Sequence, residues 1–140
     1  MAGRVRNWGQ APIVRSESTP AQACGRQAEQ LAEQYLRERG LRPIARNVRC
    51  RGGEIDLVCL DDDTLVFVEV RLRRNHRFGG AAASITPRKQ QRVIVAAQWW
   101  LSAAGRRHAT RACRFDAILL DALDAKSIEW IPSAFTLDTW

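Results

Sequence analysis

The sequence predicts one α/β domain in which a mixed central sheet is flanked by helices. The chain has 140 residues, a length that fits a single domain. Hydrophobic residues make up 46% of it, which suffices for a core without disulfides or metal staples. The expected elements follow in the order α-β-β-β-α-β-β, an order that favours helices packed on a mixed sheet.

The first helix is expected over residues 21–39. Its apolar side chains recur with helical spacing and form one stripe, with Glu29 at its edge. The stripe consists of Ala28, Leu31, Ala32, Tyr35 and Leu36. Gly40 supplies the C-terminal stop. Residues 1–20 show no sustained periodicity and carry three arginines, so a flexible basic arm is expected to precede a domain over 21–140.

A second helix is expected to begin at Pro87, with Thr86 as its N-cap, and to end at Gly105. Its inward face comprises Val93, Ala96, Ala97, Trp100, Leu101 and Ala104. Val95 and Trp99 lie on the opposite face, where they would pack under the arm or the C-terminal tail, or form a dimer contact.

Five strands are expected, over residues 43–51, 54–60, 65–72, 115–120 and 127–131. Gly52 and Gly53 interrupt the β pattern between the first two strands. The turn residues 61–64 separate the next two, which predicts a hairpin. Asp116 lies in the fourth strand beside Arg114, where a structural ion pair is the favoured interpretation.

Charge and cysteine usage restrict the function classes. The net charge is +7, which indicates an anionic partner, with nucleic acid favoured over membrane lipid. The N-terminus lacks a signal-peptide stretch, and the longest apolar run, 93–97, is far too short to cross a bilayer. A cytoplasmic protein without membrane contact is therefore expected. No pair of the four cysteines has CxxC spacing, which disfavours zinc.

Two carboxylates are predicted to face one another on the hairpin. If the chain turns on Asp62 and Asp63, Asp56 lies opposite Glu69, on the same face and with Cβ atoms about 5 Å apart. Opposed like charges destabilise a sheet unless a cation lies between them. A hard ion such as Mg²⁺ or Mn²⁺ suits a carboxylate site and can activate water. The alternative is that Arg71 or another basic side chain neutralises the pair.

Several motifs together resemble a known family. The runs 53–57 (GEIDL) and 67–71 (FVEVR) resemble the PD-(D/E)xK nuclease signature. The whole stretch from about 25 to 135 resembles the YraN-like family of small bacterial proteins, which are similar to Holliday-junction resolvases. Further matching segments are 25–29 (GRQAE), 46–47 (RN), 79–84 (GGAAAS), Lys89, 114–116 (RFD) and 134–135 (AF).

The resemblance implies a restriction-endonuclease-like core and a set of site residues. It implies that Asp56, Glu69, Glu29 and the carbonyl of Val70 hold the metal. At position 71 the signature has lysine, whereas this chain has arginine, which stays protonated and cannot act as a general base. Arg71 could still stabilise charge on a phosphorane. Lys89, at the start of the second helix, is a candidate substitute for the missing lysine, or else a phosphate-contacting or solvated side chain.

Basic residues surround this predicted site and could follow a phosphodiester backbone. They are Arg73, Arg74, Arg77, Arg88 and Arg92. Three functions remain open at this point. The leading one is a metal-dependent endonuclease for DNA, including branched or junction DNA, which a homodimer would suit. The second is a catalytically inactive nucleic-acid-binding protein with a nuclease fold. The third is a protein-interaction domain that uses Val95 and Trp99.

Overall fold

A computed structural model describes residues 19–73 and 85–137. The elements are α2 (Pro20–Glu38), β1 (Arg42–Cys50), β2 (Gly53–Asp61), β3 (Thr64–Leu72), α3 (Pro87–Ser102), β4 (Cys113–Leu120) and β5 (Ile128–Phe135). Two short 3-10 helices, η3 (Arg106–His108) and η4 (Ala125–Ser127), join the later elements. The predicted element order is confirmed.

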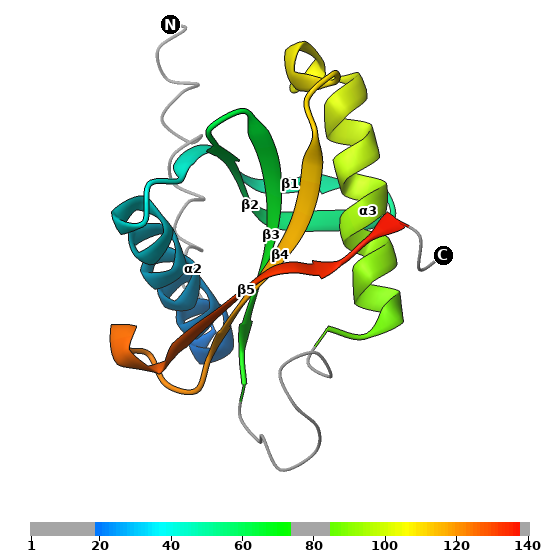
Figure 1. Ribbon diagram of the computed structural model, residues 1–140. Helices are drawn as coiled ribbons and strands as arrows, with labels where there is room; N and C mark the ends of the chain where they lie inside the picture. Colours follow the sequence, from blue (N-terminus) through cyan, green and yellow to red (C-terminus); the bar gives the residue numbers. More distant parts are fainter. Residues whose placement is uncertain (1–18, 74–84, 138–140) are drawn as a thin grey trace, which may run out of the picture.

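The strands form one mixed sheet in chain order, β1-β2-β3-β4-β5. Only the central pair, β3 and β4, runs parallel; the other neighbours are antiparallel. This arrangement follows from the connections: short turns link the antiparallel neighbours, whereas α3 lies in the long crossover between β3 and β4. Figure 1 shows α2 and α3 on opposite sides of the sheet.

Each helix covers one face of the sheet with its apolar stripe. Ala28, Ala32 and Leu36 of α2 pack on the face that carries Leu57 and Val68. The core on the other face joins α3 to β2 and β3 through Val93, Ala96, Ala97, Trp100, Val58 and Phe67. Alternate residues of β2 and β3 therefore enter different cores, as the period of a strand requires.

Both helices begin with a capping residue, and α3 begins where the sequence predicts. Thr86 Oγ1 accepts a hydrogen bond from the Lys89 N–H at 3.2 Å. Thr19 and Gln22 form a capping box, which starts α2 at Pro20, one residue earlier than expected. Gly40 ends α2 with a φ of 92°, a left-handed conformation that suits glycine.

Some expectations for the second helix are wrong. α3 ends at Ser102 rather than at Gly105, and Ala104 is exposed, because it lies beyond the helix and off its inward face. Val95 is half-buried near the β1–β2 turn, where a Cβ on Gly52 would lie 3.8 Å from Val95 Cγ1. Trp99 is 46% exposed.

None of the described helices has both the length and the apolar character that crossing a membrane requires.

Asp116 has the structural role that the sequence favours. It is fully buried, and its carboxylate accepts hydrogen bonds from the Arg114 guanidinium, from Trp130 Nε1 at 3.0 Å and from the Ser133 N–H at 2.9 Å. These contacts fix β5 where its register against β4 shifts. Of the four cysteines, Cys59 is buried, Cys24 and Cys50 are half-buried and Cys113 is exposed, and all four are free thiols.

Candidate active site

The β2–β3 hairpin has the predicted register, and it opens at the predicted carboxylates. Asp61 pairs with Thr64, and the pairing continues to Leu57 with Val68. Beyond that point β2 stays paired with β1, while β3 continues beside β4. Asp56 and Glu69 are the next residues in this register, so they stand where the two strands separate. The same register would place Glu54 opposite Arg71, but both lie beyond the paired segment of the two strands.

A hydrogen bond from the backbone of β3 to a side chain of β2 joins the two strands where their pairing ends. The Val70 N–H donates a hydrogen bond to Asp56 Oδ2 at 2.8 Å. This bond ties the Asp56 side chain to β3 after backbone pairing has ended. It also lowers the pKa of Asp56, against the larger effect of burial, which raises it. Val70 therefore contributes to the site through its N–H, in addition to the carbonyl that the resemblance implies.

Three carboxyl groups interact around the opening. The charge of Asp56, on β2, acts on both Glu29, from α2, and Glu69, from β3. Burial and the charge of Asp56 raise the pKa of Glu69 to about 8. Burial and the same charge raise the pKa of Glu29 to about 7. Glu69, and in part Glu29, therefore retain protons near neutral pH.

Two basic side chains lie close to Glu69. Lys89 Nζ lies 3.5 Å from Glu69 Oε2, so the start of α3 reaches the sheet as the sequence predicts. The charges of Lys89 and Arg71 both lower the pKa of Glu69. The pKa nevertheless stays well above its ordinary value, which means that these two cations do not compensate the buried negative charge. The predicted neutralisation by basic residues is therefore partial.

The chemistry of the donor set fits a hard divalent ion. Asp56 and Glu69 offer oxygen ligands, and Mg²⁺ takes one or two carboxylates and completes its shell with water or phosphate. In the described ranges 19–73 and 85–137, no group of three or more His, Cys, Asp or Glu side chains is arranged around a metal position. Glu29 and Asp56 line the same hollow, and the charge of Asp56 raises the pKa of Glu29.

The predicted basic surround is found in part. Arg88 is exposed and Arg92 half-buried at the start of α3, the helix end that holds Lys89. Arg73 is engaged elsewhere, because its guanidinium contacts Asp121 at 2.8 Å and Glu129 at 3.4 Å. Arg74 and Arg77 lie outside the described residues, as do most of the arm, residues 1–18, and the segment 79–84.

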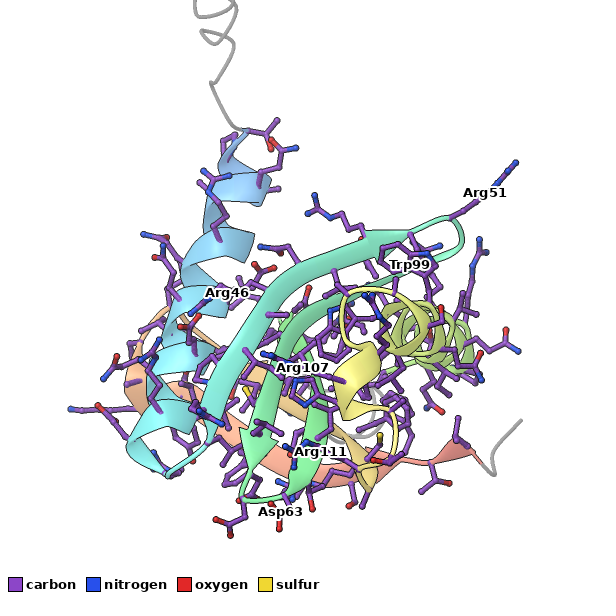
Figure 2. The ribbon with its side chains drawn as sticks, turned by 90° about the horizontal axis from the view of Figure 1, so that it is seen from above. Arg46, Arg51, Asp63, Trp99, Arg107 and Arg111 are labelled. Atoms are coloured by element: carbon purple, nitrogen blue, oxygen red, sulfur yellow. The ribbon has the colours of Figure 1, made fainter. Side chains whose placement is uncertain are left out.

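A polar groove that the sequence did not predict leads to the carboxylates. It runs between α2 and β1 and comprises two hollows of 390 and 540 Å³ that share Arg26, Glu29 and Asn47. We call it the α2–β1 groove. The first hollow reaches Asp56, and the second extends to Gly25 and Arg49. Figure 2 shows Arg46 lying between α2 and β1, where it is held by Glu33.

Asn47 occupies a special position in this groove. In the β1–β2 register, Arg46 faces Leu57 and Val48 faces Ile55, which places Asn47 opposite Asp56. Its φ is 50°, a left-handed conformation that asparagine tolerates better than most residues. An asparagine inside a run of strand-forming residues was the available sequence signal.

Comparison with known proteins identifies the family. The profile of "Uncharacterised protein family UPF0102" matches residues 28–120. A UPF0102 protein of Methylobacillus flagellatus is 55% identical over 112 residues, covering 80% of this chain and 96% of the relative. One of Stutzerimonas stutzeri is 53% identical over 116 residues, covering 82% and 96%. The chain belongs to the UPF0102 family. UPF0102 is the YraN-like family that the motifs predict.

The UPF0102 match includes the candidate site. Glu29, Asp56, Glu69, Arg71 and Lys89 all lie within residues 28–120. A third relative, from Aeromonas hydrophila, is 48% identical over 111 residues, covering 79% of this chain and 83% of the relative.

Proposed function

We propose that this UPF0102 protein is a metal-dependent endonuclease that cleaves phosphodiester bonds of DNA, including branched or junction DNA. One observation carries the proposal: Asp56 and Glu69 lie at the point where β2 separates from β3, and burial together with the charge of Asp56 raises the pKa of both Glu69 and Glu29. Carboxyl groups with strongly shifted pKa values gather at functional sites. The basic balance of the chain, +7, suits a polyanionic substrate.

In the proposed site, Asp56 and Glu69 hold Mg²⁺ or Mn²⁺, with the Val70 carbonyl as a further ligand. When bound, the divalent ion neutralises phosphate charge and lowers the pKa of water. The hydrogen bond from the Val70 N–H keeps Asp56 aimed into the opening. Glu29, whose pKa is raised to about 7, is suited to hold or accept a proton near neutral pH.

Lys89 and Arg71 supply positive charge to the reacting phosphate. Lys89 Nζ already contacts Glu69 at 3.5 Å, which places an ammonium group beside the proposed metal ligands. Arg71 follows Glu69 by two residues on β3 and acts on it electrostatically. Charged donors placed where negative charge develops stabilise a phosphorane-like transition state. Lys89 thereby takes the place of the lysine that the signature has at position 71.

Cleavage assays test this proposal. Labelled flap and four-way-junction DNA is incubated with Mn²⁺ and with wild type, Asp56→Asn, Glu69→Gln or Asp63→Asn. Asp63 is a matched control, because it is an exposed acid at the turn of the same hairpin (Figure 2). Incision by wild type and Asp63→Asn, and its loss in the other two variants, supports the proposal. Equal cutting by all four proteins, or by none, rejects it.

Arg71 motivates a second candidate function, a nucleic-acid-binding protein that has the site without turnover. The nuclease signature has lysine where this chain has a side chain that cannot give up its proton. This candidate predicts salt-sensitive DNA binding that is the same with and without Mn²⁺, and no incision. Metal-dependent incision that is lost in Asp56→Asn excludes it.

A further inference from the structure

Gly25 has no structural reason to be glycine within the described fold. It lies inside α2, where glycine costs about 0.5–1 kcal/mol relative to alanine. Its φ is not positive, and a Cβ built on it meets no atom within 4 Å. Gly53 is the contrast, since a Cβ there would lie 2.1 Å from the Arg92 carbonyl oxygen. The space beside Gly25 is part of the α2–β1 groove.

The groove has the dimensions and polarity of a path for one strand of nucleic acid. Its lining residues on α2 run from Gln22 to Arg37, about 22 Å at 1.5 Å per residue, which is room for a few nucleotides. The described lining residues are charged or polar apart from Leu57 and Gly25, and none is aromatic. Such a lining contacts phosphates and sugars and offers no platform for base stacking.

The end of the α2–β1 groove that Arg49 lines can attract an anion. Arg49 is exposed there, and its charge lowers the pKa of Glu29. Arg46 and Arg37 both contact Glu33, which partly neutralises the other end. Asn47 lies between these ends and opposite Asp56, and its amide is an uncharged donor that can meet a phosphate oxygen.

We propose that a DNA strand lies in the α2–β1 groove and passes close to the backbone of α2 at Gly25, with Asn47 and Arg49 contacting its phosphates. The proposal rests on the function proposed above and adds the path of the substrate to it. Glycine at position 25 then leaves room for the approaching strand. Asn47 is a binding residue that leads the strand to Asp56.

Fluorescence anisotropy with a labelled oligonucleotide in EDTA tests the path without any cleavage. Asn47→Gly is expected to weaken binding about tenfold or more, the value of a lost hydrogen bond to a charged group. Gly25→Leu is expected to weaken it at least as much, because its side chain fills the space that the strand would occupy. Arg49→Ala is expected to lower the slope of log affinity against log salt by about one. Glycine readily adopts the φ of Asn47, and leucine suits a helix, so Asn47→Gly and Gly25→Leu should keep the thermal midpoint of wild type.

Two matched controls address the alternatives. Gln27→Leu puts the same side chain on another face of α2, and Arg51→Ala removes an exposed arginine that points into solvent from the β1–β2 turn (Figure 2). Both should bind like wild type. Wild-type binding by a folded Gly25→Leu variant, or no binding by wild type, overturns the path. If Asp56-dependent cleavage persists in Gly25→Leu, the proposed function stands without the path. If groove-dependent binding occurs without any cleavage, the path stands alone.

Discussion

Lys89 Nζ lies 3.5 Å from Glu69 Oε2, although the two residues come from different elements, the first turn of α3 and the middle of β3. The Thr86 cap fixes the start of α3 and thereby the height of Lys89 above the sheet. A lysine on a helix thus reaches the place where its charge acts on the carboxylates. Position 71 on β3 holds an arginine, which has a different reach and a guanidinium that stays protonated.

Replacement of Lys89 should reduce cleavage without removing DNA binding. Lys89→Gln deletes one charge beside Glu69, and the loss of one such donor costs about 10²–10³ in rate. Single-turnover cleavage measures the effect, and anisotropy measures binding in parallel. The chain offers a matched control in Lys126→Gln, because Lys126 is exposed in η4. An unchanged rate in Lys89→Gln would assign Lys89 a structural role.

The stability of the metal-free protein should fall as the pH rises from about 4.5 to about 8. Glu69 has an ordinary pKa of 4.5 and a pKa of about 8 in the fold, and Glu29 shifts from 4.5 to about 7. In this window the unfolded chain loses these protons before the folded chain does. The folded state therefore binds more protons, and the free energy of unfolding decreases with pH.

Glu69→Gln isolates this effect, because glutamine does not titrate. The difference in the free energy of unfolding between the variant and wild type should grow by a few kcal/mol between pH 5 and pH 8, since one pKa unit is worth about 1.4 kcal/mol. Urea unfolding at several pH values measures it. His108, whose pKa burial lowers, gives the opposite trend near pH 6.5 but contributes equally to both proteins. Parallel pH curves for the two proteins would contradict a proton-holding Glu69.

Asp116→Ala should destabilise the fold by about 3–5 kcal/mol, the usual cost of breaking a buried ion pair. The change leaves the Arg114 guanidinium, Trp130 Nε1 and the Ser133 N–H without their shared acceptor. Urea unfolding measures the loss, and exposed Asp124→Ala serves as a control for removal of an aspartate. A variant with the stability of wild type and impaired cleavage would instead assign Asp116 a role in the active site.

The sequence predicts the parts of this molecule that local chemistry controls. Turn residues at 61–64 set the hairpin register, and with it the neighbourhood of Asp56 and Glu69. Thr86 and Pro87 set the start of α3 and the reach of Lys89. In each case a short stretch of the chain contains all the residues that decide the geometry.

Features that depend on distant segments could not be predicted in this way. The separation of β2 from β3 depends on β2 following β1 while β3 follows β4. The groove arises from the distance between α2 and β1, and no local pattern encodes that distance. The sequence pattern predicts a strand break at Gly53, yet Gly53 pairs with β1 at the start of β2. It is glycine because α3 approaches too closely there for a side chain.

Calorimetric titration with Mn²⁺ tests the metal site most directly. Wild type should bind the ion with net release of protons, seen as a heat that varies with the ionisation enthalpy of the buffer, because the protons that Glu69 and Glu29 retain near neutral pH must leave. Asp56→Asn should show no such binding, while Asp63→Asn should match wild type. Identical heats for wild type and Asp56→Asn, or no binding by wild type, would contradict a carboxylate metal site between β2 and β3.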